Sequence, residues 1–202
     1  MPFFVTSTQS EANSCPSMFY PKTMNTSLGN KPTSGEMAIR ALEPRDRSRI
    51  EKMVVSSGKF NDVEIAIALE LVDEALREGE KSGYIFVVLG GVKDRGSAFG
   101  YACYGPTPLT QGTFDLYWIV VDPAAQRRGC GRRLLEYVER DVVQRGGRML
   151  LIETSSQESY RATIRFYERS GYHLAARIRN FYRSGDDKLI FQKELDENTV
   201  FP

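Results

Sequence analysis

The apolar residues of this chain recur with two different periods between residues 36 and 196, and each period predicts one kind of element. Short apolar or alternating runs predict seven strands, at 37–42, 84–89, 97–104, 114–121, 148–153, 172–178 and 188–195. Apolar residues three and four positions apart predict four helices, at about 43–57, 61–79, 131–146 and 159–170. Glycine, proline and asparagine mark most of the boundaries between these elements.

The order of these elements predicts the fold class. The strand at 114–121, the helix after it and the strand at 148–153 form a strand–helix–strand unit, whose two strands should be parallel. The other connections favour antiparallel pairing. We therefore expect an α/β (α+β) fold, a single mixed, mostly antiparallel sheet of about seven strands with one parallel pair, flanked by about four helices.

The two ends of the chain lack this periodicity. Residues 1–35 are rich in serine, threonine, asparagine and proline, which predicts a disordered N-terminal tail. A docking or regulatory arm is the alternative for the same segment. The periodic part, residues 36–196, has the size and apolar content of one domain, and residues 197–202 form a short C-terminal tail.

Composition and charge exclude several classes of partner. The 202 residues carry 27 basic and 26 acidic side chains, and this net charge of +1 gives no electrostatic footprint for nucleic acid or an anionic membrane. No apolar run approaches the roughly 20 residues that span a bilayer. The three cysteines are far apart without paired spacing, so no disulfide framework or metal site is expected, and a cytoplasmic location fits.

The most specific stretch lies between the strand at 114–121 and the helix that follows it. Asp122 and Pro123 end the strand, and Gln126-Arg-Arg-Gly-Cys-Gly131 leads into apolar residues at helical spacing. A turn that opens a helix presents free backbone N–H groups and the positive end of the helix dipole. This arrangement predicts a phosphate-binding site, which the arginines favour because guanidinium groups match phosphate oxygens in pairs.

Several kinds of turn could explain this stretch. A nucleoside-triphosphate loop needs Gly-Lys-Ser or Gly-Lys-Thr, whereas this turn continues from Gly131 with two arginines. A dinucleotide fingerprint matches Gly129 and Gly131, with Glu153 as the ribose-binding acid, but Leu134 replaces its third glycine and the strand ends too early. A longer loop that binds pyrophosphate through successive amides matches best. An arginine-rich helix start without a ligand is the plain alternative.

At this point a family resemblance can be named. The turn resembles the Q/R-x-x-G-x-G/A motif of the GNAT acetyltransferase superfamily, and Ile164-Arg-Phe-Tyr-Glu-Arg-Ser-Gly-Tyr172 is similar to its FYE-x-x-GF segment. The resemblance covers roughly residues 37–195 and implies acetyl-CoA as co-substrate, with no metal. The coenzyme-binding residues that it implies are Ile119, Val120 and Val121 along the pantetheine arm, and Gln126, Arg127, Arg128, Gly129, Cys130, Gly131 and Arg132 around the pyrophosphate.

The resemblance also implies a general acid and an oxyanion donor. The family's proton donor to the leaving thiolate is the tyrosine of FYE, here Tyr167, and the alternative of a packed core aromatic applies better to Phe166. The oxyanion donor is a backbone N–H of the strand before the motif, here near Val120. Six residues before Phe166 the family usually has an asparagine that contacts the coenzyme. Tyr160 stands there in this chain, so the resemblance does not extend to that contact.

A general base is also needed, because an amine with a pKa of about 10.4 is almost fully protonated at neutral pH. Asp115 is the candidate, since it is a lone carboxylate in an apolar strand and burial raises a carboxyl pKa. A satisfied or exposed aspartate is the alternative. Glu153 on the parallel strand is the reserve candidate, and Tyr117 shares the strand face of Asp115. His173 is out of phase with its apolar neighbours and is expected at the surface.

Together these expectations describe an enzyme. We expect an acetyltransferase that moves an acetyl group from acetyl-CoA to a primary amine of a small molecule, by direct attack in a ternary complex. The alternatives are a protein lysine or N-terminal acetyltransferase, a non-catalytic acyl-CoA-binding sensor, and a nicotinamide-dinucleotide enzyme. The acceptor would be recognised by the helices at 43–80, the loop at 105–112 and the final hairpin. The chain could also pair with a second copy of itself as a homodimer.

Overall fold

The computed structural model describes residues 37–94 and 96–196 of the chain. The predicted tails at 1–35 and 197–202 therefore lie outside the described residues. None of the helices within the two described ranges is long and apolar enough to cross a membrane.

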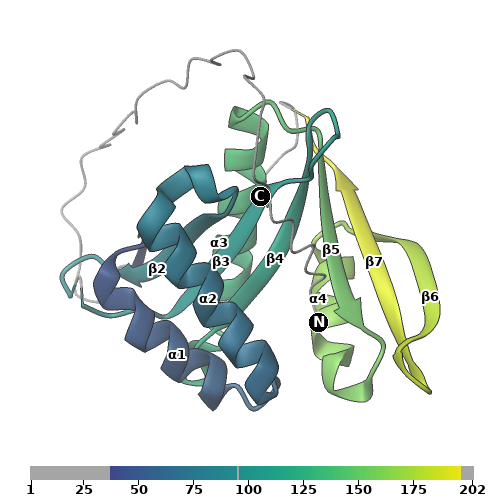
Figure 1. The fold of residues 1–202 in the computed structure, drawn as a ribbon, viewed down its shortest axis with the longest axis horizontal. Helices are drawn as coiled ribbons and strands as arrows, with labels where there is room; N and C mark the ends of the chain where they lie inside the picture. Colours follow the sequence, from purple (N-terminus) through teal and green to yellow (C-terminus); the bar gives the residue numbers. More distant parts are fainter. Residues whose placement is uncertain (1–36, 95, 197–202) are drawn as a thin grey trace.

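One sheet forms the centre of the described part, with strand order β1-β2-β3-β4-β5-β7-β6 (Figure 1). β4 and β5 are parallel, and the other neighbouring strands are antiparallel. The strands are β1 (Met37–Ala41), β2 (Ile85–Gly91), β3 (Gly100–Pro106), β4 (Thr113–Val121), β5 (Met149–Ser155), β6 (His173–Arg183) and β7 (Asp186–Glu194). The predicted mixed sheet with one parallel pair is confirmed.

Four α-helices flank this sheet within the described ranges. They are α1 (Arg47–Ser56), α2 (Asp62–Glu78), α3 (Cys130–Gln144) and α4 (Arg161–Arg169). α2 begins at the predicted position, where Asn61 caps the helix. Glu64 N–H donates a 3.0 Å hydrogen bond to the Asn61 side chain, and Asn61 N–H donates one of 2.8 Å to the Glu64 carboxylate. The predicted starts of the first and fourth helices are separate 3₁₀ turns instead, at Pro44–Asp46 and Glu158–Tyr160.

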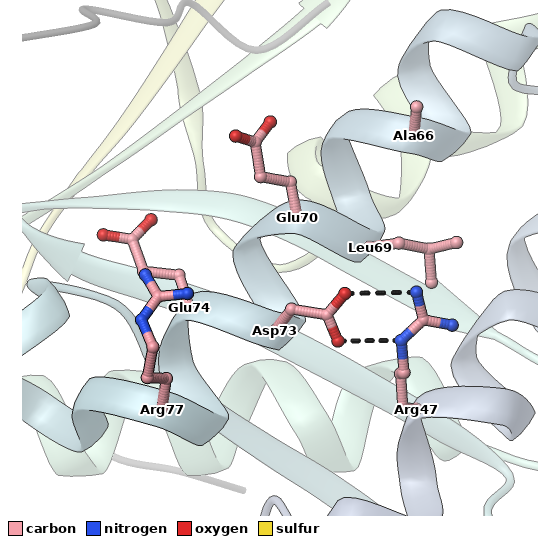
Figure 2. Close-up of a pocket in the computed structure, with 7 residues that line it drawn as sticks. All are labelled: Arg47, Ala66, Leu69, Glu70, Asp73, Glu74 and Arg77. Atoms are coloured by element: carbon pink, nitrogen blue, oxygen red, sulfur yellow. Dashed lines mark hydrogen bonds and ion pairs between the residues drawn. The ribbon is translucent and has the colours of Figure 1, made fainter.

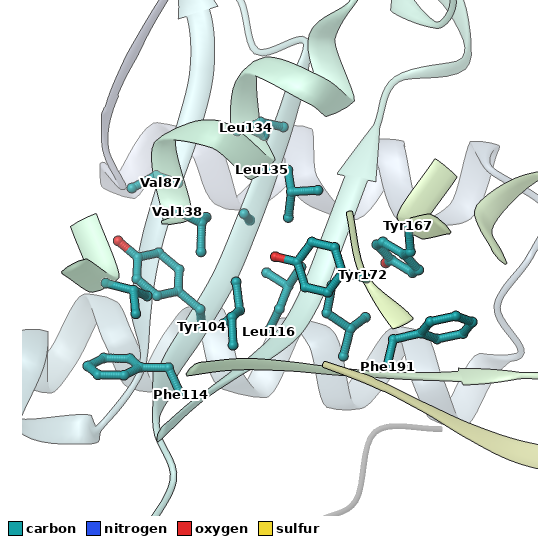
Figure 3. Packing of buried hydrophobic residues seen from close by; sticks show 14 of the residues in the cluster. Val87, Tyr104, Phe114, Leu116, Leu134, Leu135, Val138, Tyr167, Tyr172 and Phe191 are labelled. Atoms are coloured by element: carbon teal, nitrogen blue, oxygen red, sulfur yellow. The ribbon is translucent and has the colours of Figure 1, made fainter. Parts of the chain in front are cut away.

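The sheet separates two apolar cores, one on each face. α1 and α2 cover one face, where Ile50, Val72 and Trp118 are buried. α3 and α4 cover the other face, where Leu134 and Tyr167 belong to the core that Figure 3 shows from close by. Figure 1 shows α1 and α2 in front of the sheet, while α3 and α4 lie behind it. Each helix buries the apolar stripe that its sequence predicts.

The final hairpin is longer than the sequence pattern predicts. β6 continues to Arg183 instead of ending near residue 178, and the turn is confined to Ser184 and Gly185. Asp186 and Asp187, which lie before the strand predicted at 188–195, are already part of β7, and Asp187 binds Arg177 at 2.5 Å. Lys188, predicted as the first residue of that strand, binds Glu153 at 2.5 Å. The charged side chains at the start of β7 are therefore buried and paired, as buried charges must be.

Candidate active site

The two parallel strands pair over only half of their length. β4 and β5 are in register from Thr113 and Met149 to Leu116 and Ile152, and beyond these residues they no longer pair. Figure 1 shows the strands separating towards their C-terminal ends, with α4 behind them. Tyr117 is an extra residue of β4 at this point, because the pairing with β3 shifts between Cys103 and Tyr104. The divergence leaves one edge of β4 without a neighbouring strand.

The backbone of β4 beyond the bulge has one paired and one open edge. Asp122 N–H donates to Phe99 O at 2.9 Å, and Val120 O lies 2.7 Å from the place that a Cβ on Gly100 would occupy, so both residues face β3. Peptide groups alternate between the two edges of a strand. Those of Ile119 and Val121 therefore point to the open edge, where an extended ligand can add hydrogen bonds as a strand would.

The predicted phosphate turn follows directly after β4. Asp122 Oδ1 accepts a 2.8 Å hydrogen bond from Ala124 N–H and so fixes the chain as it leaves the strand. Arg127 and Gly129 then have left-handed backbone conformations, with φ of 60° and 76°, before α3 begins at Cys130. The amides of the first helical turn have no acceptor within the helix, so this turn presents N–H groups and the positive helix end to an anion.

The four arginines of the turn divide into two pairs. Arg132 binds Glu136 at 2.6 Å, and Arg133 donates a 2.7 Å hydrogen bond to Met37 O, so both guanidinium groups are held locally. Arg127 and Arg128 are exposed, and no ion pair joins them to another residue of the described part. The side chains of Arg127 and Arg128 are therefore available to an anion, whereas those of Arg132 and Arg133 already have partners.

α3 and α4 meet at the turn. A Cβ on Gly131 would lie 3.7 Å from both the Phe166 ring and the Val121 side chain, so β4, α3 and α4 converge on this glycine. Phe166 is half-buried and packs against the core behind the sheet. The start of α3 therefore lies close to the open edge of β4.

Tyr167 lies in the core behind the sheet. Its side chain is 4% exposed, and its ring is 6.1 Å from the rings of both Tyr172 and Phe191 (Figure 3). No hydrogen bond joins its hydroxyl to another described residue, so its proton is not committed to a partner within the core. Burial raises the pKa of Tyr167 well above that of a free phenol, and nearby Tyr160 adds to the effect. The side chain is therefore neutral at physiological pH.

Asp115 lies on the opposite face of β4. Its neighbours Phe114 and Leu116 point into the core of α3 and α4, so the alternation of the strand directs Asp115 away from Tyr167. Thr107 Oγ1 donates a 2.6 Å hydrogen bond to its carboxylate. Burial raises the pKa of Asp115 above its ordinary value, the hydrogen bond opposes this rise, and the charge of Glu153 adds to it.

Glu153 lies on the same face of the sheet as Asp115, directly after the last residue of β5 that pairs with β4. Its carboxylate binds Lys188 of β7 at 2.5 Å. Asp186 lies at the beginning of β7 and accepts a 2.5 Å hydrogen bond from Ser155. The charges of Glu153 and Asp186, after burial itself, raise the pKa of Tyr182. The last hairpin thus adds an acidic and aromatic group that the sequence pattern did not identify.

The structure brings the predicted residues together in two groups. The open edge of β4, the turn and α4 form the first group, which holds Ile119 to Val121, the motif residues and Tyr167. Asp115 and Glu153 form the second group on the other face, with Tyr117 beside them. The strand divergence lies between the two groups. His173 is exposed, as predicted.

A separate pocket of about 410 Å³ lies on α2 (Figure 2). Its lining is mostly charged, with three acidic and two basic side chains, and Arg47 binds Asp73 across it with contacts of 2.7 and 3.1 Å. The lining residues are Arg47, Ala66, Leu69, Glu70, Asp73, Glu74 and Arg77. None of them is a predicted catalytic or coenzyme-binding residue, although all lie on the helices at 43–80 that were expected to recognise the acceptor. The ion pair between Arg47 and Asp73 already pairs the charges at the centre of the pocket.

Comparison with known proteins identifies the family. Residues 58–172 match the model of the acetyltransferase (GNAT) family, which covers both motifs and the strands between them. The chain belongs to the GNAT family. A GNAT-family protein from Desulfovibrio desulfuricans has the same fold with a TM-score of 0.76 and 46% identity, over 80% of this chain and 100% of that chain.

Two further relatives give this GNAT chain its context. It is 33% identical over 87 residues to the [ribosomal protein bS18]-alanine N-acetyltransferase of Escherichia coli K12, covering 43% of this chain and 57% of the relative. The chain thus spans little more than half the length of that curated relative.

Solved structures give the same picture of the fold. The crystal structure of the Escherichia coli ribosomal-protein-S18-alanine N-acetyltransferase matches with a TM-score of 0.60 and 25% identity, over 82% of this chain and all of the other. A Salmonella typhimurium protein solved with its cofactor acetyl-CoA shares the fold, at a TM-score of 0.62 and 22% identity over 83% of this chain and 99% of that chain.

Proposed function

We propose that this GNAT chain transfers an acetyl group from acetyl-CoA to a primary amine by direct attack in a ternary complex. The observation that carries this proposal is the divergence of β4 and β5 beyond Leu116 and Ile152. At this divergence, the turn before α3 and the open edge of β4 lie on one face of the sheet, and the carboxylates of Asp115 and Glu153 lie on the other. A coenzyme and an acceptor can therefore meet from opposite faces of the sheet.

The coenzyme would occupy the α3 and α4 side. Its pyrophosphate would lie on the amides from Arg127 to Arg132, beside the motif's Gln126, and the exposed side chains of Arg127 and Arg128 would contact its phosphate oxygens. Its pantetheine arm would run along Ile119 to Val121 and bond to the open edge of β4. The residues present fit the group, because backbone donors and free guanidinium groups gather where the phosphates would be.

The acceptor amine must lose a proton before it attacks. Asp115 is the proposed base, acting through water, because its raised pKa makes it a better proton acceptor than an ordinary aspartate. Glu153 is the reserve candidate, since it stands nearer to the divergence but already binds Lys188. In the step itself the amine nitrogen bonds to the acetyl carbon, and the carbon–sulfur bond then breaks.

Two groups would stabilise this step. The peptide N–H groups at the open edge, those of Ile119 and Val121 on either side of Val120, would bind the oxyanion that develops on the acetyl oxygen. Tyr167 would give its proton to the thiolate as it leaves. Its raised pKa keeps the phenol protonated at every pH at which the enzyme would work.

We propose a small-molecule amine that carries positive charge as the acceptor. Glu153 and Asp186 lie near Tyr182, and Glu64 at the start of α2 adds a third carboxylate whose charge reaches the same phenol. Carboxylates beside aromatic rings favour a cation through Coulomb attraction and cation–π contacts. A protein N-terminus is the second candidate, supported by the similarity to the ribosomal protein alanine acetyltransferase.

A thiol-release screen tests this proposal. Wild-type protein and acetyl-CoA would be mixed with diamines, amino acids, peptides with free N-termini and lysine-containing peptides. We expect thiol release above the hydrolysis background, with the highest kcat/KM for a cationic small amine. Stabilisation by CoA without thiol release for any amine would favour a non-catalytic acyl-CoA sensor, and stabilisation by NAD over CoA would favour a dinucleotide enzyme. The homodimer and the cytoplasmic location stay predictions.

A further inference from the structure

The loop between α1 and α2, residues 57–61, spans the region where β4 and β5 diverge. On the β4 side, the ring of Phe60 lies 5.0 Å from that of Trp118. On the α4 side, Lys59 contacts two residues of the segment that follows β5. Because β4 and that segment lie on opposite sides of the divergence, the loop connects the two sides.

Tyr160 and Thr163 supply the contacts on the α4 side. Tyr160 Oη donates a hydrogen bond to Lys59 O at 3.4 Å, and Lys59 Nζ donates one to Thr163 Oγ1 at 3.4 Å. Tyr160 is the N-cap residue of α4 and is half-buried. Two hydrogen bonds therefore tie the loop to α4, the helix that carries Tyr167. The loop accepts one from the Tyr160 hydroxyl and donates the other to the Thr163 hydroxyl.

Tyr160 stands where the family usually has the asparagine that contacts the coenzyme. A phenol has a single proton to donate, and here that proton goes to the loop that faces the acceptor side. The Tyr160 hydroxyl thus contacts the α1–α2 loop. Loss of this hydroxyl should therefore affect binding of the acceptor and leave binding of the coenzyme largely unaffected.

The same loop carries the start of α2 with it. Glu64 is 8% exposed and is held by its reciprocal hydrogen bonds with Asn61, the last residue of the loop. The charge of Glu64 reaches both Tyr160 and Tyr182. A displaced loop would therefore also move one of the carboxylates that surround the proposed acceptor.

We propose that Tyr160 is a positioning residue for the acceptor amine, which it serves by tying the α1–α2 loop to α4 across the divergence, with Thr163 as the second tie. The expected effect on the acceptor KM rests on the proposed acetyl transfer. The hydrogen-bonded tie between the loop and α4 does not depend on turnover. The two parts are tested separately below.

The kinetic test compares Tyr160→Phe and Thr163→Val with the wild-type protein. Loss of one long hydrogen bond should raise the acceptor KM about two- to fivefold, while kcat and the acetyl-CoA KM stay within about twofold. Tyr160→Asn, with the family's residue, should raise the acceptor KM equally and lower the acetyl-CoA KM. Tyr137→Phe is the matched control, because it removes the hydroxyl of another half-buried tyrosine, on α3, and it should change neither KM.

Hydrogen exchange of the amides at residues 57–61 tests the tie without any turnover. We expect faster exchange in Tyr160→Phe and unchanged exchange in Tyr137→Phe. Equal exchange in the wild type and in Tyr160→Phe would overturn the tie. An acetyl-CoA KM that rises as much as the acceptor KM, or no change in either KM, would overturn the positioning role of Tyr160. Absence of turnover with every amine, together with faster loop exchange, would contradict the acetyl transfer and leave the tie standing.

Discussion

Lys188 Nζ lies 2.5 Å from Glu153 Oε2, at the point where β5 separates from β4. This ion pair distinguishes the two carboxylates on the acceptor side. Glu153 has Lys188 as an ion-pair partner, whereas Asp115 accepts a hydrogen bond from the neutral Thr107 hydroxyl. Burial raises the pKa of Asp115, although the Thr107 hydrogen bond and the charge of Lys188 oppose the rise. Two carboxylates on one sheet face can therefore have different roles: Asp115 as the base and Glu153 as part of the binding surface.

Asp115→Asn should lower kcat by about 10²–10⁴-fold, because general-base catalysis contributes that much. Glu153→Gln is the matched variant, which should mainly raise the acceptor KM. Burial raises the pKa of Asp115, and the base must be ionised, so activity falls as the pH drops through a value above the ordinary aspartate pKa. The acidic limb of the kcat profile should disappear in Asp115→Asn. If the limb persists there and vanishes in Glu153→Gln, the two roles are reversed.

Tyr167→Phe should also lower kcat by about 10²–10⁴-fold with little change in the CoA dissociation constant. Tyr172→Phe is the control from the same core, because it too removes a buried phenol but not the proposed proton donor. Since burial raises the pKa of Tyr167, no alkaline limb from its ionisation should appear near the ordinary phenol pKa of about 10. Equal kcat values for the two variants would mean that Tyr167 only fills the core.

Lys193→Met should destabilise the fold by about 3–5 kcal/mol. Glu139 is 2% exposed and binds Lys193 Nζ at 2.9 Å and the Tyr172 hydroxyl at 2.9 Å. Removing the lysine leaves a buried carboxylate without its cation. Urea unfolding would measure the loss, and the double variant with Glu139→Gln should recover part of it. A loss below about 1 kcal/mol in the single variant would contradict this explanation.

Gly129→Ala should destabilise the ligand-free protein, whereas Gly131→Ala should weaken the binding of CoA. Gly129 has a φ of 76°, so a side chain there strains the ligand-free protein by roughly 1–2 kcal/mol. A Cβ on Gly131 meets Phe166 and Val121 at an ordinary 3.7 Å, so the ligand-free fold should tolerate it. It would stand where the coenzyme must approach the helix start, and calorimetry should detect weaker CoA binding with an unchanged melting temperature. A large loss of stability in Gly131→Ala would contradict this.

The sequence could predict the turn and its neighbours because that information is local. Strand, motif and helix lie within residues 114–146, and the second motif contains Tyr167 itself. The bulge at Tyr117 could not be predicted, because it depends on the register with β3. The burial of Lys188 was also missed, because a lysine at the start of a predicted strand is expected at the surface until the position of Glu153 on β5 is known. The proposed acceptor side is therefore built from residues that meet only after the sheet forms.

The most direct test of the account measures both products of one reaction. Protein, acetyl-CoA and the best amine from the screen would be mixed, and free thiol and acetylated amine would be quantified over the same time course. Direct transfer predicts one thiol for each acetylated amine, with no early excess of thiol and no release without the amine. Thiol released before the amine is added, or in excess of acetylated product, would contradict direct transfer between the coenzyme and the acceptor.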